Sequence, residues 1–234
     1  MSSGFETAWA IAENVPGWLT REQASALWEA AMRVPKGAHI VEIGSHQGRS
    51  TVVLGRAAQL AGARVTAIDP FVEGRLFGGV STRDRFEANI AAAGLGDVVT
   101  LLAEYSTKAR PQWTELIDLL YIDGKHDYWT FSDDLRWSRA MAPGAEILVH
   151  DCFSSIGVTS GVVVQILPTR RYSYLDRQGS LARFQMRQPR WADRARILRE
   201  MPWFARNFVL KVLLRLRLRF VAAKLGHAGP YDPY

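Results

Sequence analysis

Carboxylate and imidazole side chains follow two apolar runs in the second half of the chain. Asp123 and His126 come after DLLYI, and His150 and Asp151 close EILVHD. Neutral imidazole near pH 7 can take the proton of an attacking hydroxyl group. Aspartate and histidine can also hold a divalent cation, which lowers the pKa of a bound hydroxyl and orients it. Both chemistries predict a site that activates a hydroxyl group.

The two chemistries assign these residues differently. In the first, Asp123, His126 and His150 are catalytic, and a histidine is the general base. In the second, Asp123, His150 and Asp151 bind a divalent cation such as Mg²⁺. The residues alone do not choose between them. For His150, a hydrogen bond that only caps its strand is a further alternative.

A second group of residues lies in HIVEIGSHQGRSTVVLG, residues 39–55, where an apolar run passes through a turn into a helical pattern. The dinucleotide fingerprint G-x-G-x-x-G would place glycines where this chain has Gly44, His46 and Arg49. With one of the three glycines present, a pyrophosphate ligand is disfavoured. Glu42 also brings negative charge toward the turn. A ligand with a positive ammonium or sulfonium group fits that carboxylate better than an anion does.

Asp69 gives the second indication of the ligand. It follows the run VTAI, 21 residues after Gly48, where an acidic side chain can accept hydrogen bonds from both hydroxyls of a ribose. The alternative is that Asp69 only caps a turn before Pro70. Taken with Glu42 and the turn one strand earlier, the pattern favours a nucleoside with a cationic tail and no pyrophosphate. S-adenosylmethionine has these features.

Apolar runs of strand length alternate with helical patterns and predict an α/β fold, a mostly parallel sheet with helices on both faces. The capping-box pattern Thr20 to Gln23 predicts the start of a helix before the first strand. A hairpin with its turn at residues 177–179 is expected to close the sheet. The expected strands are 38–43, 64–69, 98–102, 117–122, 145–150, 171–176 and 181–187, and the expected helices are 48–61, 81–93, 128–140, 156–166 and two C-terminal helices broken near Pro202.

The segments VEIGSHQGRST, VTAIDPF and LLYIDGKHDYWTFSDDLRWSRAMAPGAEILVHDCF together resemble the class I S-adenosylmethionine-dependent methyltransferases. The likeness covers roughly residues 12–187 and is greatest to a small bacterial branch with VEIGSxxGRST and IDGxHxY motifs. The resemblance implies a Rossmann-like sheet and S-adenosylmethionine as cofactor. The residues it places around the cofactor are Glu42, Gly44, Ser45, Gly48 and Ser50 at the methionine end, Asp69 at the ribose, Glu104 with Tyr105 or Ser106 by the adenine, and Asp123.

The resemblance also implies an O-methyltransferase acting on a hydroxyl of a carbohydrate or a glycosylated natural product. The chain is similar to actinobacterial sugar O-methyltransferases, including those that methylate mannose-based polysaccharides. Metal-dependent relatives place carboxylates at the ends of strands four and five. Here His150 stands where a second carboxylate or an asparagine is typical.

Composition bounds the class of protein. Of 234 residues, 48% are hydrophobic, which is enough for a folded core. Cys152 is the single cysteine and excludes an internal disulfide, and the N-terminal residues lack a secretion-signal pattern, so a cytoplasmic protein is expected. The predicted organisation is a methyltransferase domain over residues 1–187, capped by N-terminal helices within 1–36, and a basic amphipathic helical extension over 188–234.

The segment 203–225 is apolar and basic, and too charged to span a membrane. On a helix, Lys211, Arg215 and Arg219 would form a stripe beside leucines. Such a helix could lie on an anionic membrane surface, contact a partner or a second copy, cover the site, or pack on its own domain. The alternation in LRLRLRF also permits a short strand. Without an aromatic stacking platform, nucleic-acid binding is disfavoured.

Two rival classes remain open at this stage. One is a non-catalytic protein of the same fold that docks through its basic tail, and the other is an NAD-dependent enzyme, which the missing glycines disfavour. Residues 71–80, with Gly74, Gly78 and Gly79 as hinges, predict either a mobile lid or a plain surface loop.

Overall fold

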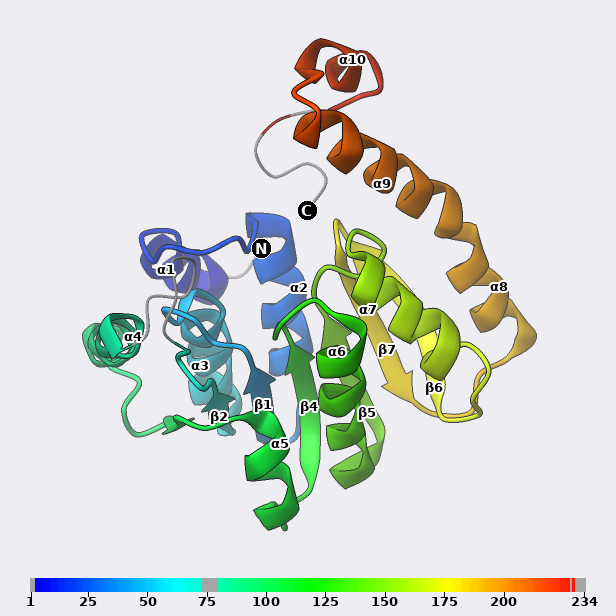
Figure 1. Cartoon of the computed structure of the whole chain (residues 1–234). Helices are drawn as coiled ribbons and strands as arrows, with labels where there is room; N and C mark the ends of the chain where they lie inside the picture. The colour runs from blue at the N-terminus through cyan, green and yellow to red at the C-terminus, as the bar shows by residue number, and fades with distance from the viewer. Residues whose placement is uncertain (1–2, 73–79, 228, 230–234) are drawn as a thin grey trace.

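In the computed structural model, which describes residues 3–72, 80–227 and 229, the strands form one seven-stranded sheet (Figure 1). The strand order is β3-β2-β1-β4-β5-β7-β6, and β7 is antiparallel to both of its neighbours while the others pair in parallel. The strands are β1 His39–Ile43, β2 Arg64–Ile68, β3 Val99–Leu102, β4 Ile117–Ile122, β5 Met141–Val149, β6 Tyr172–Gln178 and β7 Leu181–Met186. This order confirms the predicted Rossmann-like methyltransferase sheet.

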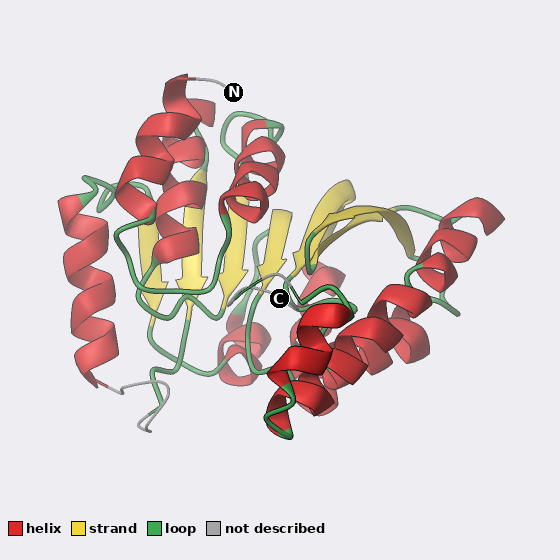
Figure 2. Ribbon diagram, turned by 90° about the horizontal axis from the view of Figure 1, so that it is seen from above, coloured by secondary structure: helices red, strands yellow, loops and turns green. Residues whose placement is uncertain are grey.

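Helices lie on both faces of the sheet, as Figure 2 shows. They are α1 Ser3–Ala12, α2 Arg21–Met32, α3 Arg49–Ala61, α4 Val80–Ala92, α5 Ser106–Ala109, α6 Tyr128–Leu135, α7 Ile156–Gly161, α8 Trp191–Arg199, α9 Met201–Arg215 and α10 Arg219–Lys224. Short 3₁₀ turns cover Arg110–Gln112 and Arg136–Ala140, and a π turn covers Val162–Ile166.

Each central strand supplies two hydrophobic cores because its side chains alternate between the faces. On β1, Ile40 packs with the core under α1 to α4, whereas Val41 and Ile43 join the core under α6 and α7. On β4, Tyr121 and Ile122 divide in the same way. Burial on both faces explains why these strands are apolar at consecutive positions.

Several predicted boundaries were wrong. β5 begins at Met141 rather than 145 because Met141 pairs with Ile117 across a register shift. The helix predicted over 128–140 tightens to a 3₁₀ turn after Leu135, as helix ends often do. The helix predicted over 156–166 becomes a π turn from Val162. The hairpin turn lies later than predicted, at residues 179–180, with Gly179 at φ +58°.

The C-terminal helices break where the sequence predicts, with Pro202 in the first turn of α9. The predicted basic stripe from Lys211 to Arg219 is wrong, because α9 ends at Arg215 and Arg217 adopts a left-handed φ of +61°. Arg219 then opens α10. Among the described residues, every helix is too short or too polar to cross a membrane. The predicted hinges Gly74, Gly78 and Gly79 lie outside the described residues.

Candidate active site

The turn between β1 and α3 presses directly against the end of β4. Gly44 has a φ of +89°, and a Cβ added there would overlap the carbonyl oxygen of Asp123. Gly48, at φ +91°, lies against the ring of Phe86. Glycine is therefore required at Gly44 both by conformation and by space. This contact places the predicted cofactor turn beside the first of the acidic residues.

Glu42 supports this turn from behind. Its side chain is fully buried and accepts hydrogen bonds from the hydroxyls of Ser50 and Thr51, the latter at 2.5 Å. Burial raises the pKa of Glu42 to about 7, although the two hydroxyl groups oppose that shift. The sequence predicts a carboxylate that faces a cationic ligand. In the structure Glu42 is enclosed and holds the first turn of α3 instead.

Asp69 joins β2 to the same turn. Its Oδ2 accepts hydrogen bonds from the backbone N–H groups of Ser45 and His46, both at 2.9 Å. Its Oδ1 accepts a hydrogen bond from the backbone N–H of Phe71 at 2.8 Å. This is the turn-capping contact expected if Asp69 only caps the turn at Pro70. Each carboxylate oxygen has two acceptor positions, so Oδ1 keeps capacity for a ligand hydroxyl.

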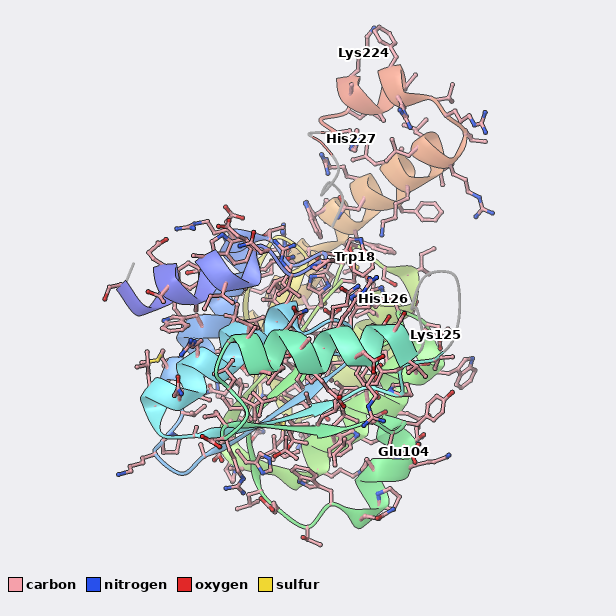
Figure 3. The ribbon with its side chains drawn as sticks, turned by 90° about the vertical axis from the view of Figure 1, so that its left-hand side faces the viewer. Trp18, Glu104, Lys125, His126, Lys224 and His227 are labelled. Atoms are coloured by element: carbon pink, nitrogen blue, oxygen red, sulfur yellow. The ribbon has the colours of Figure 1, made fainter. Side chains whose placement is uncertain are left out.

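The rim above this turn is aromatic. Trp18 is 55% exposed, and its ring lies 5.4 Å from the ring of His46, centroid to centroid. His46 adopts a φ of +46°, and burial lowers the pKa of its imidazole. Figure 3 shows Trp18 and His126 at the same end of the molecule. Trp18, which contacts His46 of the cofactor turn, and the histidine cluster therefore lie on the same side of the domain.

The predicted acidic and histidine residues form one cluster. Asp123 Oδ1 lies 3.2 Å from His150 Nδ1 and 3.5 Å from His126 Nε2. Asp123 Oδ2 accepts a hydrogen bond from the phenol of Tyr121 at 2.8 Å. The ring of His126 reaches Asp151 on its other side, with Nδ1 2.7 Å from Oδ2. His126 thus lies between two carboxylates.

The loop that carries Asp151 is held in an unusual conformation. Asp151 and Phe153 both have left-handed φ values, +53° and +59°, which non-glycine residues rarely adopt. Asp151 Oδ1 accepts a hydrogen bond from Ser154 at 2.9 Å. From the C-terminal extension, Asn207 donates to the carbonyl of Phe153 at 3.2 Å, and Lys211 donates to that of Ser154 at 2.9 Å.

The cluster pairs negatively charged aspartates with positively charged histidines. Burial alone would lower the pKa of His126, but its pairing with Asp123 and Asp151 raises that pKa to about 10. Burial would also lower the pKa of His150, but the charge and hydrogen bond of Asp123 and the charge of Asp151 together raise it. Burial alone would raise the pKa of both aspartates, yet the adjacent imidazoles hold both below their usual range. The carboxylates are therefore ionised near pH 7, and His126 is not a free base in this charge state.

A residue of the N-terminal helices orients His150. Gln23 accepts a hydrogen bond from the backbone N–H of Thr20, which confirms the predicted capping box. The same Oε1 lies 3.3 Å from His150 Nε2, and Gln23 Nε2 donates to Ser180 Oγ at 3.1 Å. Because an amide oxygen only accepts, His150 Nε2 carries a proton, and its Nδ1, which faces the ionised Asp123, carries a second one when the ring is charged.

The residues predicted near the adenine lie apart from the cluster. Glu104 is about half-exposed and accepts a hydrogen bond from the backbone N–H of Tyr105, and Figure 3 shows it well away from His126. Ser106 donates to the buried carboxyl of Asp134 at 2.5 Å. Ser106 thus points into the fold, so Glu104 and the half-exposed Tyr105 are the better candidates for a ligand contact.

Within the described part of the chain, the grouped metal donors are Asp123, His126 and His150, each with one donor atom within 4.8 Å of the other two. The sequence predicts Asp151, and not His126, as the third metal ligand beside Asp123 and His150. In the structure the carboxylate of Asp151 is nearly enclosed and binds His126 and Ser154. The sequence also missed Gln23 and Tyr121 as partners of the cluster, although the capping box had already marked Gln23 as a fixed side chain.

Comparisons with known proteins bear on the family and the fold. Residues 41–152 match a family model described as a methyltransferase domain. Rv0187 from MTB, in a cofactor-bound crystal structure, is 17% identical with a TM-score of 0.61, and the match covers 81% of this chain and 92% of that one. The O-methyltransferase TomG from Streptomyces achromogenes, involved in tomaymycin synthesis and crystallised with S-adenosylmethionine, is 16% identical with a TM-score of 0.59, covering 80% and 91%.

A third similar structure is the Podospora anserina methyltransferase PaMTH1 bound to S-adenosylhomocysteine, 14% identical with a TM-score of 0.61, covering 80% of this chain and 89% of that one. At such identities these likenesses establish the fold. Together with the match to a methyltransferase domain over residues 41–152, they give the chain the Rossmann-like fold of methyltransferases. The methyltransferase domain matched over residues 41–152 and the Rossmann-like fold agree with the resemblance that the sequence shows to the class I S-adenosylmethionine-dependent methyltransferases.

Proposed function

We propose that the chain transfers the methyl group of S-adenosylmethionine to a hydroxyl oxygen held at Asp123. The observation that carries this proposal is the contact between the cofactor turn and the acidic cluster. Gly44 packs against the backbone of Asp123, whose side chain meets His126 and His150. A methyl donor in the turn and an acceptor at Asp123 would therefore be neighbours. The printed description of TomG as an O-methyltransferase supports oxygen as the acceptor atom.

On the cofactor side, we assign the turn residues Gly44, Ser45, Gly48 and Ser50 to the methionine end, and Asp69 to the ribose. The free acceptor position on Asp69 Oδ1 supports the second assignment. Glu104 would lie by the adenine, with its half-exposed carboxylate 3.6 Å from the ammonium group of Lys108. Glu42 would affect cofactor binding indirectly, because it accepts a hydrogen bond from Ser50 and so fixes the helix turn that contains this residue.

The charges favour Asp123 as the proton acceptor. As the hydroxyl oxygen bonds to the methyl carbon, the bond from carbon to sulfur breaks, and the hydroxyl proton becomes acidic enough for a carboxylate to take. Asp123 is ionised, and its side chain is 25% exposed. His126, between Asp123 and Asp151, balances the two negative charges. A histidine base would require His126 or His150 to lose its proton first.

Asp123, His126 and His150 also suit a divalent cation. One carboxylate and two imidazoles fit a transition-metal ion such as Mn²⁺ or Zn²⁺ better than Mg²⁺, which prefers oxygen ligands. A bound cation would lower the pKa of the acceptor hydroxyl. Calorimetric titration of Mn²⁺, Zn²⁺ and Mg²⁺ into the wild type and Asp123→Ala would test the site. Binding that Asp123→Ala leaves unchanged would contradict this donor set.

For the acceptor, we propose a hydroxyl of a carbohydrate or a glycosylated natural product, with mannosides of an actinobacterial polysaccharide as the first class to examine. The branch resemblance supports this choice, as does the description of TomG in the synthesis of a natural product. The test is a screen with methyl-labelled cofactor against mannosides, glycosylated natural products and a catechol. Labelled product from the sugars and none from the catechol is the expected result.

The alternative is a protein that binds the cofactor without turnover and docks through its C-terminal extension. The exposed apolar residues of that extension favour a docking role. Saturable binding of S-adenosylhomocysteine without product from any acceptor would support this alternative. Product formation abolished by Asp123→Asn would support the enzyme.

A further inference from the structure

The C-terminal helices project from the domain. In Figure 1, α9 runs from α8 past the upper end of the sheet, and α10 lies beyond it. Figure 3 shows Lys224 at the tip farthest from the sheet. We call residues 208–225 the arm. The arm lies outside residues 41–152, which match the methyltransferase family, so it is an addition to that segment.

One side of the arm is fixed to the domain. Leu210, within the arm, is fully buried. Asn207, which directly precedes the arm, is also fully buried and donates a hydrogen bond to the carbonyl of Phe153. Lys211 donates to the carbonyl of Ser154, and burial lowers the pKa of this ammonium group. These contacts orient α9, so its other side faces away from the domain in a defined direction.

The outward side of α9, the turn after it and α10 expose many large apolar side chains. Every residue from 215 to 221 is exposed. Phe220 is 73% exposed and Leu216 is 62% exposed. The exposed large apolar side chains of the arm are Phe208, Val209, Val212, Leu216, Leu218, Phe220, Val221 and Leu225. Single exposed apolar residues are common, but a contiguous group of this kind marks an interaction surface.

The same surface is positively charged. The arm contains no acidic residue, and four of its basic residues, Arg215, Arg217, Arg219 and Lys224, are exposed. Arg215, Arg217 and Arg219 are exposed and alternate with Leu216 and Leu218. Lys224 lies 4.5 Å from the ring centre of Phe220. Bulky apolar groups next to unbalanced positive charge are the combination that binds at the boundary between lipid headgroups and acyl chains.

We propose that the arm docks the enzyme on an anionic lipid surface. The apolar side chains would enter the headgroup region, and the arginines would contact lipid phosphates. A second copy of the chain fits less well, because an arm-to-arm contact would bring two arginine clusters together. A nucleic acid would neutralise the charge but leave the leucines and Phe220 exposed to water. This inference holds whichever acceptor the enzyme uses.

The test is co-flotation of the full chain with phosphatidylcholine vesicles, with and without phosphatidylglycerol. We expect binding only to the anionic vesicles, and release by high salt, because screening weakens attraction between surface charges. The variant Arg215→Gln/Arg217→Gln/Arg219→Gln should bind roughly a hundredfold more weakly, since each basic residue near an anionic bilayer contributes about fivefold. Phe220→Ser keeps the charge and should still weaken binding about tenfold, through lost apolar burial.

The control is Arg83→Gln/Arg136→Gln/Arg139→Gln, which removes three exposed charges from the domain and should leave vesicle binding within about twofold. Matching far-ultraviolet spectra and melting temperatures would show that all variants fold. Failure to bind anionic vesicles, or equal losses in the control and the arm variant, would overturn the proposal. So would a dimer in solution that Phe220→Ser dissociates, or nucleic-acid binding that Phe220→Ser leaves intact.

Discussion

The two halves of the site use carboxylates in opposite ways. At the ends of β1 and β2, Glu42 and Asp69 accept hydrogen bonds from neutral donors, hydroxyls in one case and backbone N–H groups in the other. At the ends of β4 and β5, Asp123 and Asp151 are paired with imidazoles. Neutral donors shape a turn without adding charge. Protonated imidazoles bring positive charge, and they can release a proton or bind a metal cation in its place.

The pKa values follow this division. Burial raises the pKa of Glu42 to about 7, while neighbouring imidazoles lower that of Asp123 despite its burial. The same type of side chain at one edge of one sheet is thus held close to neutral on one side and ionised on the other, which fits the proposed proton transfer at Asp123. We expect substitutions on the two sides to separate accordingly, with effects on cofactor binding and folding on one and on the chemical step on the other.

The largest effect should come from the acceptor side. Asp123→Asn removes the proposed proton acceptor and should lower kcat by about 10²–10⁴-fold with little change in S-adenosylhomocysteine affinity. Steady-state kinetics and calorimetric titration would measure the two quantities. Asp133→Asn, on the neighbouring helix α6, is the matched control and should keep near-normal kcat. An equal loss of cofactor affinity in Asp123→Asn would remove the distinction between the halves.

Gly44 joins the two halves, so its substitution should damage both. Gly44→Ala combines a positive φ with overlap on the Asp123 carbonyl and should destabilise the fold by about 3 kcal/mol or more. Gly144→Ala is the control, because Gly144 has a φ of +83° with open space around it. Denaturant unfolding should give about 1 kcal/mol for that variant. Equal losses would mean that conformation alone, and not the contact between the halves, decides the outcome.

Glu42 makes the cofactor half sensitive to pH. With a pKa raised from 4.5 to about 7, the folded chain keeps a proton that the unfolded chain releases, so stability falls as the pH rises through that window and levels off above it. Glu42→Gln removes this dependence. Between pH 4.5 and 7 its free energy of unfolding should gain about 3 kcal/mol relative to the wild type. The exposed Glu29→Gln should show no such trend in the same unfolding series.

The smallest effect should come from Asp69. Asp69→Asn loses the charged acceptor for two backbone N–H groups and for the ribose, and should weaken S-adenosylhomocysteine binding by about tenfold. Calorimetric titration measures it, with the exposed Asp97→Asn as control. Because Asp69 lies in the cofactor half, kcat at saturating cofactor should change little. A large fall in kcat with unchanged affinity would contradict the division.

The fold was largely predictable from the sequence, because strands buried on both faces leave consecutive apolar positions and the hairpin turn carries Gly179. The acidic and histidine cluster was predictable for a related reason, since parallel strands end at one edge of the sheet. The enclosure of Glu42 and the pairing of His126 with Asp151 were not. They depend on side-chain directions after packing, and in the second case on the left-handed conformation of Asp151.

The contact of Gln23 with His150 could not be predicted from the local sequence pattern, for the same reason. Its two residues are 127 positions apart, and nothing near Gln23 in the sequence specifies the partner. The C-terminal extension was predicted as basic and amphipathic, but the end of helix α9 at Arg215 was not, because a single left-handed residue, Arg217, redirects the chain.

The Gln23 hydrogen bonds also set an order of events during synthesis on the ribosome. Gln23 Nε2 binds Ser180, which is 157 residues further along the chain. At ordinary translation speeds, helix α2 is therefore made roughly 10 to 30 s before this partner exists. A nascent chain that ends before the β6–β7 hairpin can contain the complete cofactor turn, yet it lacks the serine that holds the Gln23 amide against His150. The cofactor turn can therefore form before the cluster at Asp123 has all of its supporting contacts, which come from the β6–β7 hairpin and then from Asn207 and Lys211.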